Sequence, residues 1–320
     1  MSNRFIPPAN IPKSLWSQEF KKLMLPELVV QSWYQIIKRE SLEVLAKQTA
    51  PRGFEGGASK EDTDKHLAWR YTGSSARVIL SMLDPHEELS GIADTYASTF
   101  AGNKVFLVDI PSGSGAAAIS ILCILYELRK HNALPRHPLK IFVLSGEISD
   151  SAKNYNDDQL AQLAPLLEEQ AIWIECESIS WDATCRISTS DLIKKATLKS
   201  QGYTNKLLVL SNFSGFLEHH GKWKEARQQI ENIFLHSRDV NSHAIWLEPQ
   251  RKTIPRFVSR LLGLFANLFG GLFRNDNTSS SPHGHSYAST ESKCQHPLKE
   301  HTFNVRLTVL RFELPERKKI

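Results

Sequence analysis

The feature that most constrains the fold is a regular alternation that begins at Lys104. Short apolar runs suited to buried strands are separated by segments in which apolar residues recur at helical spacing. The expected strands are Val105–Asp109, Ile141–Ser145, Ile172–Glu175, Leu207–Ser211 and Ala244–Glu248. The expected helices lie near residues 115–130, 156–170, 189–201, 222–237 and 255–270. This alternation predicts an α/β fold with a mostly parallel sheet and helices on both faces.

Two further regions frame this pattern. Residues 1–100 have helical spacing and few strand signals, so we expect a helical N-terminal region that covers a cofactor or recognises an acceptor or partner. Residues 101–320 form the predicted α/β domain. Within it, a polar stretch near 275–296 is expected to be a flexible insertion, and the alternating run Phe303–Leu314 is expected to be a late strand.

The most informative segment is KVFLVDIPSGSGAAAISIL, residues 104–122. A buried strand ends in Asp109, a turn containing Gly113 and Gly115 follows, and small residues then open a helix. Glycine lets backbone approach a ligand closely, and the unpaired N–H groups of a helix N-terminus favour polar or negative groups. The segment therefore predicts a nucleotide-type ligand, although tight strand-to-helix turns also use glycine for structural reasons alone.

Later strand ends carry residue types that suit a nucleoside. Glu147 ends the second strand, where a carboxylate can accept hydrogen bonds from ribose hydroxyls. Trp181 and Asp182 follow the third strand, where an aromatic ring can cover a base and an acid can bond an exocyclic amine. Polar and glycine residues, 211–215, end the fourth strand. Open α/β sheets bind ligands at this edge.

These motifs, in this order over about residues 104–314, resemble those of class I S-adenosylmethionine-dependent methyltransferases. The resemblance implies a Rossmann-like sheet with an antiparallel last strand, here Phe303–Leu314, and S-adenosylmethionine as cofactor. It also implies that Asp109 faces the methionine amino group, Glu147 the ribose and Asp182 the adenine, with Asn212 and Phe213 at the methyl-transfer edge. The cofactor-binding set it implies is Asp109, Pro111, Ser112, Gly113, Ser114, Gly115, Glu147, Ile148, Trp181, Asp182, Asn212 and Phe213.

The sequence also departs from this family's pattern. Pro111 stands at the first glycine position of the loop, where it fixes φ and removes an N–H. The fourth motif lacks the Asn/Asp-Pro-Pro-Tyr/Phe signature of base-amine methylation, and a Pro-Cys pair for cytosine C5 chemistry is absent. The acceptor is therefore undetermined, and a catalytically inactive scaffold subunit of a larger complex remains the alternative. His219 and His220 are the candidate general bases if the acceptor must lose a proton.

Two other nucleotide sites fit the loop less well. The run Gly113–Ala118 satisfies a loose dinucleotide pattern, but Glu147 lies 34 residues after Gly113, where about 20 is usual. An acid at the end of the first strand would also repel a pyrophosphate. A phosphoribosyltransferase loop usually begins with two adjacent acids, whereas Ile110 follows Asp109 here.

The distribution of charge and the cysteines limit the expected class of acceptor and the expected compartment. Residues 251–320 hold 12 basic and 5 acidic residues, which accounts for the net charge of +5 and leans slightly toward a nucleic-acid acceptor. The cysteines contain no C-x-x-C pair, and neither a signal peptide nor an uninterrupted apolar span of about 18 residues is present. We therefore expect a cytoplasmic protein without a disulfide framework.

Three remaining segments carry weaker predictions. The apolar stretch 254–273 is expected to be a helix packed on the sheet or, alternatively, an exposed amphipathic surface for a partner or a membrane interface. Arg70, Arg77 and the run 71–75 are candidate substrate contacts or helix caps. No metal site is expected, because the spacing of the remaining candidate ligands matches no zinc template: His283, His285, Cys294 and His296.

Overall fold

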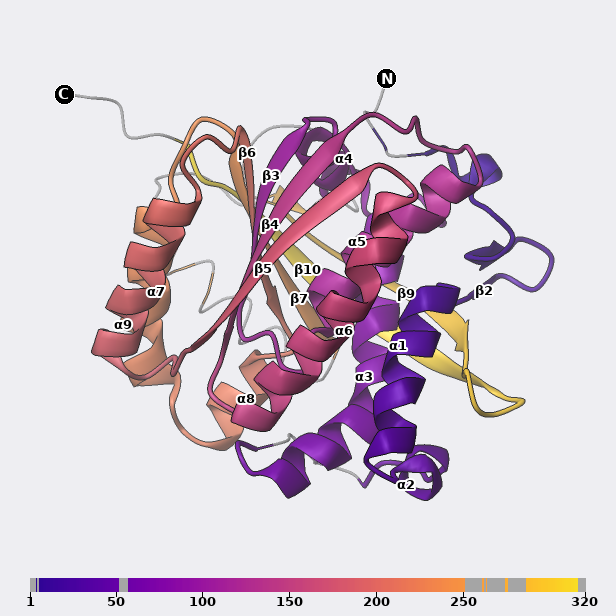
Figure 1. Ribbon diagram of the computed structural model, residues 1–320, viewed down its shortest axis with the longest axis horizontal. Coiled ribbons are helices and arrows are strands. Elements are labelled where there is room, and N and C mark those ends of the chain that lie inside the picture. Colours follow the sequence, from indigo (N-terminus) through magenta and orange to yellow (C-terminus); the bar gives the residue numbers. More distant parts are fainter. Residues whose placement is uncertain are drawn as a thin grey trace.

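The computed structural model describes residues 4, 6–51, 57–250, 261, 263, 274–275 and 286–315. Figure 1 shows a central twisted sheet between two groups of helices. The helices are η1 (Pro8–Asn10), α1 (Glu27–Arg39), α2 (Glu43–Lys47), α3 (Lys60–Leu83), α4 (Ser90–Phe100), α5 (Ala116–Lys130), α6 (Asp150–Glu168), α7 (Arg186–Lys199), α8 (Ser214–His219) and α9 (Trp223–His236). The strands are β1 (Trp16–Ser17), β2 (Lys22–Leu23), β3 (Lys104–Asp109), β4 (Leu139–Glu147), β5 (Ile172–Ser180), β6 (Asn205–Ser211), β7 (Ser242–Pro249), β8 (Arg274–Asn275), β9 (Ser286–Gln295) and β10 (Thr302–Glu313).

The sheet order confirms the predicted fold class. Five parallel strands run in the order β5-β4-β3-β6-β7, and β10 joins β7 in the antiparallel sense. The chain thus starts in the middle of the sheet at β3, builds outward to β5, and then returns to build β6 and β7 on the other side. This reversal places a topological switch point beside the end of β3, which is where open α/β sheets bind ligands.

Apolar residues on both faces of the sheet explain the two helical layers. Along β3, Val105 and Leu107 face one core, whereas Phe106 and Val108 face the other. The first core also takes side chains from α1, α3, α4, α5 and α6, and the second from α7, α8 and α9. The strands β3, β4, β6 and β7 are therefore mostly apolar and buried, as expected where both faces of a parallel sheet are covered, whereas the edge strand β5 is largely half-buried or exposed.

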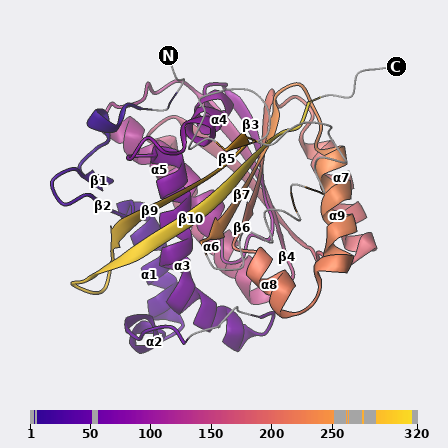
Figure 2. The same ribbon diagram turned by 180° about the vertical axis from the view of Figure 1, so that it is seen from behind.

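Part of the expected polar insertion is a strand. Residues 286–295 form β9, which pairs along its length with β10, and Figure 2 shows the two as a long hairpin at one side of the molecule. Small side chains alternate inward along β9, including buried Ala288 and Cys294. Because most of these inward residues are serine or threonine, apolar alternation gave no strand signal. Residues 276–285 of the insertion lie outside the described residues.

The N-terminal region is not a separate packing unit. Side chains from α1, α3 and α4 lie in the same hydrophobic core as α5 and the strands, and β2 pairs with β9 through Leu23 and Cys294. The boundary expected at residue 100 therefore does not coincide with a break in the core. No helix among the described residues is long and apolar enough to cross a membrane. Within the stretch 254–273, only Leu261, which is buried, and Gly263 are described.

Candidate functional site

Asp109 ends β3 at the switch point and is completely buried. Its Oδ2 accepts a hydrogen bond of 3.1 Å from the N–H of Ala118, in the first turn of α5. Its Oδ1 has no hydrogen-bond partner among the described residues. Burial raises the pKa of Asp109 to about 7, the Ala118 N–H opposes this rise, and the nearby Glu147 charge adds to it. The structure thus holds a costly buried acceptor next to a helix N-terminus.

Glu147 ends β4 and holds the glycine loop. Its Oε2 accepts from the Gly113 N–H at 2.9 Å, and its Oε1 accepts from the N–H groups of Ile148 and Ser149 at 2.9 and 3.0 Å. Burial raises the pKa of Glu147, and the three N–H groups act against that rise. Two lone pairs on each oxygen leave Oε2 one acceptor position for a ligand hydroxyl.

The two loop glycines have different roles. Gly113 has a φ of +53°, and a Cβ placed there would meet nothing within 4 Å, so the space in front of it is open. Gly115 has a φ of +87°, and a Cβ there would lie 2.2 Å from Oδ1 of Asn156. Gly115 is therefore required by packing, whereas Gly113 offers backbone that a ligand can approach closely.

The remaining loop residues complete the turn between β3 and α5. Ser112 donates its N–H to the carbonyl of Gly146, and Gly115 donates its N–H to the carbonyl of Ser112. Ser112 and Ser114 are buried, and Pro111 follows a cis peptide bond. These backbone bonds make the loop compact.

The residues expected at the adenine are engaged within the protein. Trp181 is 1% exposed, donates from Nε1 to Thr189 and packs 6.0 Å, centroid to centroid, from the ring of Phe213. Asp182 accepts from the N–H and the hydroxyl of Thr184 through Oδ1, both at 2.8 Å. Ile148, by contrast, is exposed. In this arrangement Trp181 is a core side chain, whereas Asp182 and Ile148 keep some access to solvent.

The end of β6 meets α3. Asn212 has a φ of +56°, and its Oδ1 accepts from Nε of Arg77 at 2.8 Å. The structure therefore brings one of the predicted substrate residues to the expected methyl-transfer edge. Arg70 donates to the carbonyl of Pro51 at 3.3 Å. His219 and His220 are both exposed at the end of α8, and their rings lie 5.1 Å apart.

Glu248 is a site residue that the sequence argument missed. It is fully buried near the end of β7, and its Oε1 accepts from the N–H groups of Phe213 and Ser214 and from Nε1 of Trp246. Burial raises its pKa. The signal was present in the sequence, because β3, β4 and β7 all place an acid at or next to their carboxyl ends. Glu248 fixes the fourth motif in the way that Glu147 fixes the glycine loop.

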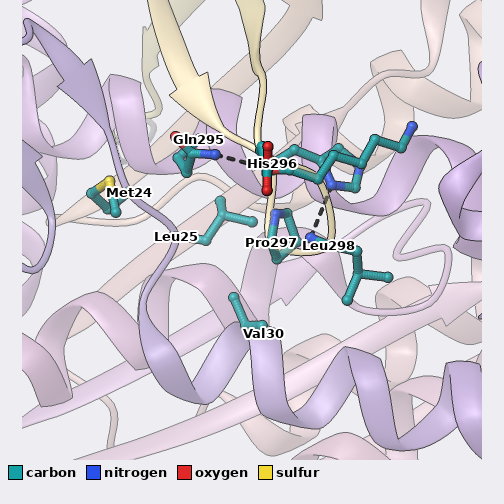
Figure 3. A pocket seen from close by; sticks show the side chains of 9 residues that line it. Met24, Leu25, Val30, Gln295, His296, Pro297 and Leu298 are labelled. Carbon is teal, nitrogen blue, oxygen red and sulfur yellow. Dashed lines mark hydrogen bonds between the residues drawn. The ribbon is translucent and has the colours of Figure 1, made fainter.

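Cavities lined by described residues include three that have no residue of the glycine loop in their lining. Figure 3 shows the one between the start of α1 and the β9–β10 turn, a space of about 540 Å³ that His296 and Leu298 help to line. Burial lowers the pKa of His296 to about 4. Cys294 is buried in β9, whereas His283 and His285 lie outside the described residues. Within the described part of the chain, no three His, Cys, Asp or Glu side chains gather in a way that could hold a metal ion.

Comparisons with known proteins give only remote likenesses. No protein-family model matches the chain, and no curated protein matches it at a significant level. A SAM-dependent methyltransferase from Methanosarcina mazei is 11% identical over 68% of this chain and 97% of its own, with a TM-score of 0.34. A protein studied for the conversion of a disulfide bond into a thioacetal group in echinomycin biosynthesis is 13% identical over 71% of this chain and 81% of its own, with a TM-score of 0.32. Both TM-scores are below 0.5, so neither likeness decides the function of this chain.

Proposed function

We propose that this chain is an S-adenosylmethionine-dependent methyltransferase. The observation that carries the proposal is Asp109, a fully buried carboxyl group at the switch point whose Oδ1 has no partner among the described residues. Such a group is costly unless a ligand completes its hydrogen bonds, and a cationic amino group is the most favourable donor for it. The methionine part of S-adenosylmethionine carries such an amino group.

The neighbouring residues fit the rest of this cofactor. The open space at Gly113 lets the methionine and ribose approach the backbone, and the last acceptor position of Glu147 suits one ribose hydroxyl. Bound S-adenosylmethionine would supply a methyl group already activated by a sulfonium. The residues of this chain then need only bind, orient and exclude water.

A binding subunit without turnover is the second candidate. It is favoured by the engagement of Glu147 with three N–H donors and by the burial of Trp181, which leave fewer groups for the cofactor than the resemblance implies. Transfer of a radiolabelled methyl group from S-adenosylmethionine to RNA, DNA or small-molecule acceptors would exclude this candidate. The basic excess in residues 251–320 makes nucleic acid the first acceptor to try.

The proposal is tested by calorimetric titration with S-adenosylhomocysteine, which retains the amino group and the ribose. Asp109→Asn keeps the shape of the side chain and the acceptor for Ala118 but removes the charge. Loss of a charge-assisted hydrogen bond, worth about 1.5–3 kcal/mol, should weaken binding roughly 10- to 150-fold. Asp84→Asn is the matched control, because Asp84 is also a buried acid but caps the far end of α3. Equal affinity in the wild type and Asp109→Asn would reject the site.

A further inference from the structure

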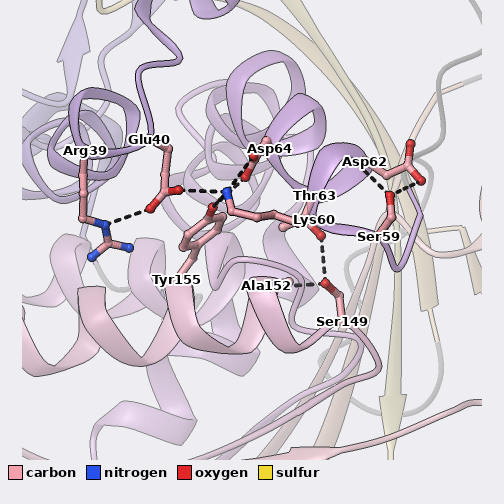
Figure 4. Close-up of polar contacts among 10 residues, drawn as sticks. All are labelled: Arg39, Glu40, Ser59, Lys60, Asp62, Thr63, Asp64, Ser149, Ala152 and Tyr155. Atoms are coloured by element: carbon pink, nitrogen blue, oxygen red, sulfur yellow. Dashed lines mark hydrogen bonds and ion pairs between the residues drawn. The ribbon is translucent and has the colours of Figure 1, made fainter.

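Helix α3 is fixed at its start by a cluster of charged side chains, shown in Figure 4. Nζ of Lys60 lies 2.8 Å from carboxylate oxygens of Glu40 and Asp64 and 3.0 Å from the hydroxyl of Tyr155. Arg39 also pairs with Glu40, and it links the cluster to Asp158. These contacts join α3 to the end of α1 and to one face of α6. The first turn of α3 therefore has a defined position relative to the loop that follows β4.

A first chain of hydrogen bonds leads from α3 to the glycine loop. The hydroxyls of Thr63 and Ser149 lie 2.8 Å apart, and both residues are buried (Figure 4). Ser149 also accepts from the Ala152 N–H, and its own N–H donates to Oε1 of Glu147. The other oxygen of Glu147 holds the N–H of Gly113. Thr63 is thus three hydrogen bonds away from the backbone of the loop.

A second chain starts eight residues later on the same helix. The hydroxyl of Tyr71 donates to Oε1 of Gln159 at 2.9 Å, and Nε2 of Gln159 donates to the carbonyl of Ser114 at 2.8 Å. The same amide accepts from the hydroxyl of Ser32 and donates to the carbonyl of Tyr155. The Gln159 amide donates both of its hydrogens, and its Oε1 accepts from Tyr71 and shares the single Ser32 hydroxyl hydrogen with the carbonyl of Val29, so the amide has one fixed orientation. Tyr71 and Gln159 are both buried.

Both chains end on consecutive residues of one loop, the N–H of Gly113 and the carbonyl of Ser114. We propose that Thr63, Tyr71 and Gln159 are positioning residues that hold the glycine loop in its binding conformation. The consequence for the cofactor rests on the proposed function. The N-terminal region then sets the geometry of the binding loop through the hydrogen bonds of Thr63 and Tyr71 in α3. This role is separate from any contact that the region makes with an acceptor.

Backbone hydrogen bonds make the loop compact, but its own side chains add little to hold the Gly113–Ser114 pair. The hydroxyl of Ser112 is 3.4 Å from the carbonyl of Gly113, a long hydrogen bond. Gly113 and Gly115 both adopt positive φ, a region in which glycine keeps wide conformational freedom. Fixed partners on both sides of the Gly113–Ser114 pair therefore remove motion that a ligand would otherwise have to arrest on binding.

Tyr71→Phe tests the second chain, with Tyr96→Phe as the matched control. Both tyrosines are buried, but the hydroxyl of Tyr96 is hydrogen-bonded to Ser81, and among the described residues neither Gln159 nor the glycine loop is a hydrogen-bond partner of it. Amide hydrogen exchange is measured in the ligand-free protein at Ser112, Gly113 and Gly115, whose N–H groups are all bonded. Loss of the Tyr71 hydrogen bond should speed exchange there about 3- to 10-fold, and Tyr96→Phe should leave it unchanged. Equal effects of both variants would overturn the positioning role of Tyr71.

Substitutions of Thr63 test the first chain of hydrogen bonds independently. Thr63→Val keeps the shape but loses the hydroxyl, whereas Thr63→Ser keeps the hydroxyl. Faster loop exchange in the valine variant, restored in the serine variant, supports the first chain, and indistinguishable exchange in the two variants contradicts it. Tyr71→Phe and Thr63→Val are also titrated with S-adenosylhomocysteine, for which we expect weaker binding by a similar factor, whereas Tyr96→Phe and Thr63→Ser should bind it as the wild type does. If the wild type binds none while the loop still loosens as expected, the proposed function fails and the positioning of the loop stands.

Discussion

At Asp109, stability and ligand recognition make opposite demands on one carboxyl group. Complete burial favours its protonated form, whereas a cationic ligand would favour its ionised form. The Ala118 N–H offsets part of the cost of the charge through Oδ2, but Oδ1 receives nothing from the described residues. Buried carboxyl groups with an unsatisfied oxygen are typical of binding sites, where the residue that binds the ligand gives a lower free energy of unfolding than a better-satisfied residue would.

The first prediction concerns how stability changes with pH. The pKa of Asp109 is raised from 3.8 to about 7 in the folded chain, so this group stabilises the fold fully below pH about 4. That contribution is lost as the pH rises through about 7, and from the pKa change it is at most about 4 kcal/mol. Asp109→Asn cannot ionise, so its free energy of unfolding should rise relative to the wild type between pH 5 and pH 8. Urea unfolding at both pH values measures the difference, and a constant gap between the two proteins would contradict this assignment.

The second prediction concerns binding at the same residue. If the ligand amino group pairs with ionised Asp109, protonation of Asp109 competes with binding as the pH falls below about 7. The affinity for S-adenosylhomocysteine should then drop by up to about tenfold per pH unit between pH 7 and 5.5. Titrations of Asp109→Asn over the same range serve as the control and should give a flat profile. Parallel profiles for the two proteins would show that another group titrates.

At the scale of single elements, one glycine in α3 and one in β4 allow the effect of backbone entropy on stability to be measured apart from the effect of side-chain packing. Gly73 lies within α3, and an added Cβ there would have 3.8 Å to the nearest atom, a guanidinium nitrogen of Arg77. Gly146 lies in β4, where an added Cβ would come within 2.8 Å of Ile110 and 3.2 Å of Trp181. The same substitution to alanine therefore makes an ordinary van der Waals contact in the helix and meets a filled core in the strand.

Gly73→Ala should raise the free energy of unfolding by about 0.5–1 kcal/mol, because alanine loses less backbone entropy in a helix. Gly146→Ala should lower it by about 1–3 kcal/mol, because Ile110 or Trp181 must move. Denaturant unfolding of both variants beside the wild type gives the two signs directly. A destabilising Gly73→Ala would mean that α3 is more tightly packed at this turn than its contacts indicate.

At the scale of the whole molecule, the sequence predicted what depends on continuous apolar pattern. The five parallel strands and four of the helices appear close to their expected ranges. The strands β3, β4, β6 and β7 are mostly buried and leave a nearly unbroken apolar signal, whereas the edge strand β5 was recognised only from its apolar start and extends further than expected. Strand β9 escaped prediction because serine and threonine fill its inward positions. The contact of Arg77 with Asn212 spans 135 residues of chain, and no local pattern encodes such a pairing. Residues at the end of each strand could therefore be predicted from local sequence. Their contacts with α3 could be identified only from the three-dimensional structure.

The shared core leads to a prediction about the chain as a unit. Buried side chains of α1, α3 and α4 lie in one cluster with α5 and the central strands, so removing residues 1–100 would expose the face of the sheet that α5 and α6 cover only in part. A chain of residues 101–320 should therefore fail to fold alone. The full chain should unfold in one transition in which the calorimetric and van't Hoff enthalpies agree. Two separate transitions, or a soluble 101–320 chain with native near-ultraviolet circular dichroism, would show instead that the N-terminal region is an independent domain placed on a complete one.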